Sequence, residues 1–243
     1  MYSKKDWFTD WFDTKYYHIL YQHRDEHEAE IFIRNLATLL KLPKNSHILD
    51  LACGKGRHAI FLNKLGYRVT GADISMNSIE HANQYKNERL HFIIQDMRLP
   101  FNLKTEAIFN LFTSFGYFAD EGDDLNVLQN IKNSLKTNGV AVIDYLNVTK
   151  TAKNLVPKEI ITLDHIKFHI SREIKNDFII KKIEFTINQK QHCYYERVKY
   201  LNRSQFEDYF KKVGLKIKSC FGDYHLNTFN QQSSDRLIFI LEK

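Results

Sequence analysis

The sequence predicts an α/β protein: a mostly parallel, doubly wound sheet with an inserted antiparallel β meander. Between residues 47 and 146, short and nearly all-apolar strands alternate with helical segments, which is typical of a parallel sheet covered on both faces. From about residue 159 to 201, apolar and polar residues alternate instead, which is typical of antiparallel strands with one solvated face. A chain of 243 residues with 43% hydrophobic residues can bury the core of one such domain.

The first half of the chain supplies the alternating elements. Phe32, Leu36 and Leu39 recur at helical spacing and predict a helix over 25–41, with Asp25 and Glu28 able to cap its start. Strands are then expected at 47–52, 67–73, 90–96, 106–112 and 139–146, and helices at 57–65, 75–86 and 125–135, with a turn at 138–139 before the last strand. Gly66 is expected to end the second helix.

The meander predicted at 159–201 contains about four strands. Ile166, Phe168 and Ile170 alternate with polar residues, and turns are expected at 176–177 and 188–189. A helix over 204–213 and strands over 216–223 and 236–243 complete the chain. The whole insertion, 156–201, follows the carboxyl end of a main strand, where open α/β sheets bind ligands. We therefore expect it to form a lid or a wall of a substrate site.

Composition excludes several classes of protein. The opening residues, MYSKKDWFTDWFDTKYY, lack the apolar run of a signal peptide, and no stretch reaches the ~20 apolar residues of a membrane span. The three cysteines are scattered without CxxC spacing, so neither a disulfide framework nor a metal site is predicted. We expect a cytoplasmic protein with no membrane partner.

The net charge of +6 raises the question of a nucleic-acid partner. Phosphate contacts need Lys and Arg side chains gathered on one surface. Here the lysines are spread along the chain among carboxylates, as in KKIEF and FEDYFKK, and form no basic tail. A nucleic-acid partner is therefore disfavoured, although it stays open.

A glycine-containing loop, LDLACGKGR at residues 49–57, joins the first predicted strand to a helix. Gly54 and Gly56 allow the backbone to turn tightly and to approach a ligand, and the amides of the following helix face the same place. The loop fits a loose dinucleotide fingerprint, with Asp73 at about the expected distance. However, Asp50 at the strand end would repel a pyrophosphate, whereas it would attract the ammonium group of S-adenosylmethionine (SAM).

The segment Asp50-Leu51-Ala52-Cys53-Gly54-Lys55-Gly56 resembles the D-x-[GA]-x-G-x-G motif of the class I SAM-dependent methyltransferases, with Ala52 in place of the commoner glycine. The order of elements from about residue 24 to 243 is similar to the seven-stranded, Rossmann-like sheet of that family. The resemblance implies a single methyltransferase domain over 1–243, with SAM as cofactor and S-adenosylhomocysteine as product.

The same resemblance implies roles for residues that follow the next two strands. Asp73 would bind both ribose hydroxyls, and Asp96 would accept a hydrogen bond from the adenine amino group. Ile74 and Met97 would flank the purine ring. For each aspartate the alternative is a helix N-cap, and Asp73 stands close enough to the helix predicted from Ser75 to be one.

Two aromatic segments are expected near the reacting end of the cofactor. NLFTSFGYF, residues 110–118, resembles a segment of small-molecule-type members of the family, and its aromatic rings could enclose the sulfonium or pack in the core. YYHILYQHRD, residues 16–25, resembles the segment that closes over the cofactor in these relatives, which implies a covering segment over 1–24. The candidates are Phe112, Phe115, Tyr117 and Phe118 in the first segment, and Tyr17, Tyr21 and Arg24 in the second, with Arg24 a partner for the methionine carboxylate.

Methyl transfer from a sulfonium is an in-line displacement that needs no protein nucleophile. The protein must align acceptor, methyl group and sulfur and exclude water. A general base is needed only for an acceptor that arrives protonated. The candidates for it are Tyr117, His165, His169, Tyr195 and Tyr224.

The acceptor predicted from the sequence is a small molecule. Methyltransferases that act on nucleic-acid bases often carry N-P-P-[FY] after the fourth strand, where this chain has Asn110-Leu111-Phe112-Thr113. Alternatives stay open: an RNA or protein methyltransferase, a non-catalytic or regulatory protein that binds SAM or its product, and, least favoured, an NAD-dependent oxidoreductase. Monomer and homodimer are both compatible with the sequence.

Overall fold

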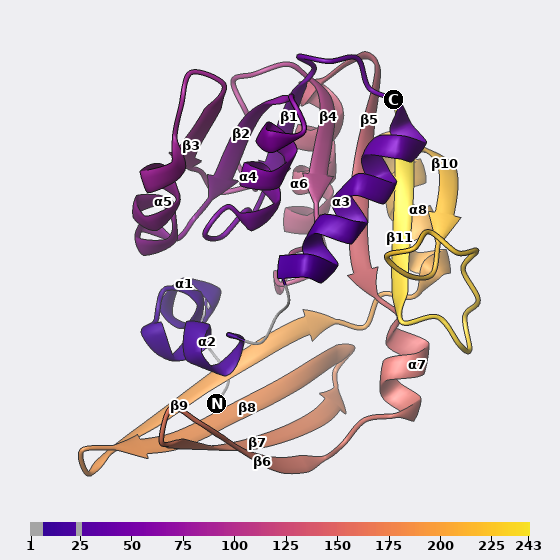
Figure 1. Cartoon of the computed structure of the whole chain (residues 1–243). Helices are drawn as coiled ribbons and strands as arrows, with labels where there is room; N and C mark the ends of the chain where they lie inside the picture. Colours follow the sequence, from indigo (N-terminus) through magenta and orange to yellow (C-terminus); the bar gives the residue numbers. More distant parts are fainter. Residues whose placement is uncertain (1–6, 23–25) are drawn as a thin grey trace.

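The computed structural model describes residues 7–22 and 26–243 (Figure 1). The large sheet consists of β1 (His47–Leu51), β2 (Arg68–Asp73), β3 (Leu90–Ile94), β4 (Thr105–Asn110), β5 (Leu135–Leu146), β10 (Lys216–Phe221) and β11 (Arg236–Glu242). Its strand order is β10-β11-β5-β4-β1-β2-β3. The first five strands of the chain are parallel, and β11 runs antiparallel to its neighbours β5 and β10. The predicted α/β class with a mostly parallel seven-stranded sheet is confirmed.

Helices cover both faces of this sheet (Figure 1). One face carries α3 (Glu26–Leu40), α4 (Arg57–Lys64) and α5 (Met76–Ala82), the last followed by a 3-10 turn over Asn83–Tyr85; the other face carries α6 (Glu121–Ser134) and α8 (Arg203–Val213). The apolar residues that predicted α3, such as Phe32 and Leu36, are buried against the sheet. None of the helices in the described part of the chain is long and apolar enough to cross a membrane.

The turn predicted at 138–139 lies inside a strand. β5 begins at Leu135, directly after α6, and the pairing with β4 jumps from Leu135 opposite Thr105 to Val140 opposite Ala107. The intervening residues form a bulge, in which Asn138 adopts a left-handed backbone with φ of 61°. The turn-forming residues were recognised correctly, but the strand continues through them.

The predicted meander forms a separate antiparallel sheet below the large one in Figure 1. Its strands are β6 (Lys158–Leu163), β7 (Ile166–Lys175), β8 (Phe178–Ile187) and β9 (Lys190–Lys199), paired in that order. The turns predicted at 176–177 and 188–189 are confirmed, and both residues of each have positive φ, as two-residue hairpins favour. A third hairpin at 164–165 and a short helix, α7 (Val148–Lys153), which connects β5 to this sheet, were not predicted.

Two short helices that the sequence analysis did not assign lie between the two sheets (Figure 1). These N-terminal helices are α1 (Trp7–Phe12) and α2 (Lys15–Leu20). Trp11 and Leu20 are each only 1% exposed, because they belong to an apolar cluster that also contains residues of the small sheet and of α6 and α8. The two sheets therefore share one core through the N-terminal helices.

Candidate cofactor and acceptor site

A cavity of about 810 Å³ opens at the carboxyl ends of the parallel strands. The segments that follow β1, β2, β3 and β4 line it, together with the N-terminal helices and β9 of the small sheet. This position is the one at which open α/β sheets bind their ligands. The volume is that of a site for a small molecule or a nucleotide-sized cofactor.

The loop after β1 approaches the cavity in a left-handed conformation. Ala52 has φ of 61° and Gly54 has φ of 54°, and both residues line the cavity. A residue with a Cβ is strained in this region of backbone space. The conformation explains why the resembling motif commonly has glycine where this chain has Ala52.

Gly56 allows close packing between the start of α4 and β3. It precedes α4 with φ of 85° and is not among the residues that line the cavity. A Cβ on Gly56 would come within 2.6 Å of Phe92 Cε1 on β3. The glycine therefore allows α4 to start close against the sheet, whereas the sequence predicted that Gly56 lets the backbone approach a ligand.

Asp50 carries a buried carboxylate at the end of β1. It is 1% exposed and lines the cavity, and its Oδ2 has no hydrogen-bond partner among the described residues. Burial raises the pKa of Asp50 to about 7, against the lowering effect of a hydrogen bond from the Ala59 backbone. A buried carboxylate with one unsatisfied oxygen favours a ligand that brings a cationic donor.

Asp73, at the end of β2, holds two backbone segments in place. Its Oδ2 accepts from Gly54 N–H (2.7 Å) and its Oδ1 from Ser75 N–H (2.8 Å). Burial raises the pKa of Asp73, while these hydrogen bonds lower it. The cap of α5 is Ser75, whose hydroxyl accepts from Ser78 N–H. The carboxylate of Asp73 also accepts from the Ile74 backbone, and it keeps acceptor capacity for a ligand hydroxyl.

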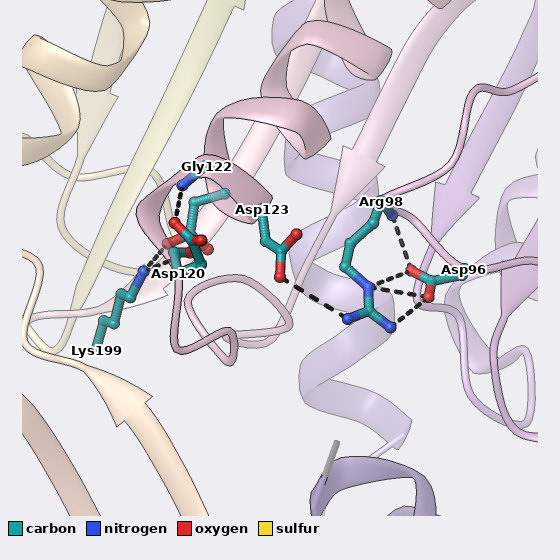
Figure 2. A network of polar contacts seen from close by, with 7 residues as sticks. Asp96, Arg98, Asp120, Gly122, Asp123 and Lys199 are labelled. Atoms are coloured by element: carbon teal, nitrogen blue, oxygen red, sulfur yellow. Dashed lines mark hydrogen bonds and ion pairs between the residues drawn. The ribbon is translucent and has the colours of Figure 1, made fainter. Parts of the chain in front are cut away.

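Asp96, which follows β3, is paired with Arg98 (Figure 2). The Arg98 Nε and Nη2 atoms donate to the carboxylate at distances of 2.6 to 3.1 Å, and Arg98 N–H donates to Oδ1 at 2.9 Å. Burial raises the pKa of Asp96, but these bonds hold it below its ordinary value. Arg98 also lies 3.9 Å from Asp123 of α6. Asp96 therefore accepts hydrogen bonds from Arg98 and also lines the cavity, where a ligand can reach its carboxylate.

The turn after β4 is held in a strained form. Phe112 and Thr113 have φ of 64° and 61°, a region that costs of order 1 kcal/mol or more per residue. Buried Asp144 accepts from Phe112 N–H (2.7 Å) and from Arg236 Nε (2.7 Å), and Arg236 Nη2 donates to Thr113 Oγ1 (2.9 Å). This network fixes the Phe112 ring at the cavity wall, where the Arg57 guanidinium lies 4.5 Å from the ring centroid.

Glu196 of β9 joins the N-terminal helices to the small sheet. Its Oε1 accepts from Trp11 Nε1 (2.7 Å), and Tyr21 Oη lies 2.7 Å from both carboxylate oxygens. Lys181 of β8 is 3.7 Å from Oε2 and donates to Tyr21 Oη at 2.5 Å. We call Trp11, Tyr21, Lys181 and Glu196 the Glu196 cluster. Tyr21 and Glu196 also line the cavity.

The connection between α1 and α2 contacts the opposite wall. Asp13 Oδ1 accepts from Ser75 Oγ (2.5 Å), and Asp13 Oδ2 accepts from Asn77 Nδ2 (2.6 Å). Ser75 and Asn77 lie at the start of α5. The N-terminal helices are therefore attached on one side to the large sheet and on the other to the small sheet, and together they cover the cavity.

The structure brings most of the predicted cofactor residues to this cavity. Those that line it are Tyr17, Tyr21, Asp50, Ala52, Gly54, Asp73, Ile74, Asp96, Met97 and Phe112. Arg24 lies outside the described residues. Phe115 packs in the core against Phe206, whereas Phe118 reaches the cavity wall.

Of the five candidates for a general base, Tyr117 alone is among the residues that line the cavity in the described part of the chain. His165 is exposed in the hairpin between β6 and β7. His169 and Tyr195 lie on the face of the small sheet opposite Phe168 and Glu196, because successive strand residues point to opposite faces. Tyr224 stacks on Phe32 and donates to Asp144 Oδ2 at 3.2 Å.

Several residues that line the cavity were not predicted from the sequence. Glu196 and Arg236 come from distant strands and belong to no motif. Trp7, Phe8 and Phe12 lie in the N-terminal aromatic segment, upstream of the residues that were singled out. Arg57 stands inside the glycine-loop segment itself and was overlooked as a side chain.

The strand order, the glycine loop and the position of this cavity define the class I SAM-dependent methyltransferases. A family model described as a methyltransferase domain matches residues 42–205, more than half of the chain. The chain therefore belongs to this methyltransferase family.

Relatives named as methyltransferases match the chain over different lengths. It is 24% identical over 234 residues to the glycine/sarcosine N-methyltransferase of Aphanothece halophytica, a match that covers 90% of this chain and 83% of that protein. It is 30% identical over 115 residues to the ubiquinone biosynthesis O-methyltransferase of Haemophilus ducreyi, with 45% and 49% covered. The chain spans about half the length of several such curated relatives.

A solved structure of a SAM-dependent methyltransferase from Clostridium acetobutylicum has the same fold. The two superpose with a TM-score of 0.79 at 20% identity, over 93% of this chain and 95% of the other. A likeness at this identity shows the fold alone.

Proposed function

We propose that the protein is a SAM-dependent methyltransferase that acts on a small molecule by in-line displacement. The observation that carries the proposal is Asp50, a buried carboxylate with an unpartnered oxygen in a large cavity beside a left-handed glycine loop. A carboxylate in that position suits the ammonium group of SAM and opposes the pyrophosphate of a dinucleotide. SAM, when bound, supplies an electrophilic methyl group on a sulfonium sulfur.

Residues after β1, β2 and β3 hold the cofactor in this proposal. Asp50 binds the ammonium group, and Asp73 accepts hydrogen bonds from the ribose hydroxyls with its remaining acceptor positions. Asp96, oriented by Arg98, accepts from the adenine amino group, between the apolar side chains of Ile74 and Met97. Ala52, Gly54 and Gly56 contribute the backbone shape of the loop.

Aromatic residues and the covering helices act on the reacting end. Phe112 and Tyr117 place aromatic faces beside the sulfonium, which such faces attract. Tyr17 and Tyr21 of the N-terminal helices exclude water, which protects the transfer from solvent. Tyr117 lines the cavity, and as a phenolate it would accept the proton of an acceptor that arrives protonated. In this proposal residues 1–243 act as a single domain.

A small-molecule acceptor is supported by the shape of the site. The cavity is covered by the N-terminal helices on one side and β9 on another, so an acceptor must fit inside it. The relative from Aphanothece halophytica is named for glycine and sarcosine, which are small molecules, and the relative from Haemophilus ducreyi is named for ubiquinone biosynthesis. RNA and protein acceptors remain the alternatives to be tested.

The test is a calorimetric titration with SAM, S-adenosylhomocysteine and NADH, followed by an acceptor screen with methyl-labelled SAM. We expect micromolar binding of the first two, no binding of NADH, and label transferred to small molecules bearing amine or hydroxyl groups. Binding of NADH alone would overturn the assignment of SAM as the cofactor. Tight SAM binding with no label in small-molecule, RNA or protein pools would make it a non-catalytic SAM-binding protein.

A further inference from the structure

The Glu196 side chain lines the cavity from the small sheet. It stands on β9 together with Val198, which also lines the cavity, and it is 16% exposed. Three residues further along β9, Lys199 N–H donates to Gly116 O at 2.8 Å, which attaches the strand to the turn that carries Tyr117. With a rise of ~3.3 Å per residue, Glu196 lies about 10 Å along the strand from that turn, a separation that a small acceptor can span.

The neighbours of Glu196 leave part of its hydrogen-bonding capacity open. Trp11 Nε1 and Tyr21 Oη bring one proton each to the carboxylate, which has about four acceptor positions. Lys181 Nζ lies 3.7 Å from Oε2, beyond hydrogen-bond distance, and donates to Tyr21 Oη at 2.5 Å. These three side chains therefore hold the carboxylate in place, and positions on it remain for a ligand in the cavity.

A row of aromatic rings connects the surroundings of Glu196 to Tyr117 along the cavity wall. The ring centroids of Tyr21 and Tyr17 are 5.0 Å apart, and those of Tyr17 and Phe12 are 4.9 Å apart. Phe12 in turn lies 5.4 Å from Tyr117, and all four rings line the cavity. Because aromatic faces attract cations, this wall and the Glu196 carboxylate favour the same positive charge on a ligand.

We propose that the methyl acceptor is an aliphatic amine, and that Glu196 binds its ammonium form and receives one of its protons. The inference rests on the proposed function and narrows its substrate class from small molecules to amines. A hydrogen bond between an ammonium group and a carboxylate is charge-assisted and is stronger than one to a neutral hydroxyl. Amines are therefore preferred over alcohols of the same shape.

The proton transfer frees the electron pair that the reaction needs. An ammonium nitrogen has no free pair until one of its protons passes to the Glu196 carboxylate. The pair then forms the bond to the methyl carbon while the bond from that carbon to sulfur breaks, and the sulfur of S-adenosylhomocysteine keeps the electrons of the broken bond. The methylated amine leaves as a cation, and the Glu196 carboxyl group returns its proton to water.

The test compares the binding of two cofactor analogues, S-adenosylhomocysteine and sinefungin. Sinefungin carries an ammonium group in the position of the methyl group of SAM, so it places a positive charge next to the acceptor site. We expect calorimetry to show that the wild-type protein binds sinefungin at least about tenfold more tightly than S-adenosylhomocysteine, and that Glu196→Gln brings the two affinities within about threefold of each other. Because the ratio is measured within one protein, it is insensitive to a general loss of folded protein.

Glu184→Gln is the matched control. Glu184 lies on the opposite face of the same sheet and pairs with Lys182, so its substitution should leave the ratio unchanged. The glutamine at position 196 keeps an oxygen for the Trp11 and Tyr21 donors and loses only the charge. Glu196→Asp, which keeps the charge on a shorter side chain, should give an intermediate ratio and serves if the glutamine variant does not fold.

Two binding results would overturn the inference and leave the proposed function standing: a wild-type protein that binds sinefungin no more tightly than S-adenosylhomocysteine, or a Glu196→Gln variant that keeps the wild-type ratio. An acceptor screen in which labelled methyl groups reach alcohols, phenols or thiols and no amine would do the same. A protein that binds neither analogue, or that transfers label to no acceptor, would overturn both the inference and the proposed function.

Discussion

Asp50 links cofactor binding to pH because its carboxyl group is buried. Burial raises its pKa to about 7, whereas the group in an unfolded chain titrates near 3.8. For the free protein, the contribution of Asp50 to stability is therefore present below about pH 4 and is lost as the pH rises through about 7. The stability of the free protein thus favours the protonated form of Asp50, whereas binding of an ammonium group needs the ionised carboxylate.

We expect the affinity for SAM to rise with pH up to about 7. Below the pKa of Asp50, binding must release a proton, which weakens the affinity by up to about tenfold for each pH unit. Calorimetric titrations between pH 5.5 and 7.5 would measure this slope. The Asp50→Asn variant should bind SAM weakly with a flat profile. A wild-type profile as flat as that of the variant would contradict the pairing of Asp50 with the ammonium group.

The N-terminal helices are the element that controls access to the cavity. They reach the small sheet through the Glu196 cluster and the start of α5 through Asp13. The two tryptophans of the chain, Trp7 and Trp11, both lie in α1. Their fluorescence therefore reports on the covering helices with no added label.

We expect Glu196→Ala to release bound SAM roughly tenfold faster, because the Trp11, Tyr21 and Lys181 side chains lose their shared acceptor and the covering helices open more readily. Stopped-flow tryptophan fluorescence would measure the dissociation rate. Glu184→Ala is the control, since Glu184 pairs with Lys182 at a more exposed position of the same sheet. Equal dissociation rates in the two variants would show that the Glu196 cluster does not hold the helices over the cofactor.

At the scale of the whole molecule, a buried ion pair joins the small sheet to α6, one of the helices that cover the large sheet (Figure 2). Lys199, at the end of β9, pairs with Asp124 of α6, which is 0% exposed, and donates to Asp120 O at 3.1 Å. Burial raises the pKa of Asp124 to about 6, even though Lys199 lowers it. The contribution of Asp124 to stability is thus present below pH 3.8 and is lost as the pH rises through about 6.

We expect Lys199→Met to destabilise the fold by about 3–5 kcal/mol at pH 8, because it leaves a buried carboxylate without its partner. At pH 5 the cost should be much smaller, since Asp124 without Lys199 stays protonated in the folded state. Urea unfolding at the two pH values would measure the difference.

The control for this prediction is Lys212→Met. It removes the surface ion pair between Lys212 of α8 and Glu121, which lies in α6 like Asp124. Both side chains are about half exposed, so the cost should be at most about 1 kcal/mol at either pH. A Lys199→Met variant whose cost does not change between pH 5 and pH 8 would show that Asp124 is ionised in the folded state without Lys199.

The sequence by itself determined the elements and the part of the site that lies on contiguous segments. Apolar periodicity identified the strands, the main helices and the change to an antiparallel meander, because each pattern arises from neighbours within a few residues. Asp50, Asp73 and Asp96 could be placed together because the carboxyl ends of parallel strands meet at one edge of a sheet. The short helices α1, α2 and α7, of 6 residues each, are too short for periodicity to detect.

Only the tertiary structure decided which distant side chains meet. Glu196 accepts a hydrogen bond from Trp11, 185 residues away in the sequence, and Lys199 donates one to Asp124, 75 residues away. The tertiary structure also decided which face of the small sheet meets the cavity. Glu196 lies on that face and lines the cavity, whereas His169 and Tyr195 lie on the opposite face. The physical reason is that periodicity records which face of an element is apolar, whereas the partner of a polar side chain is set by how the elements pack, and no local pattern contains that information.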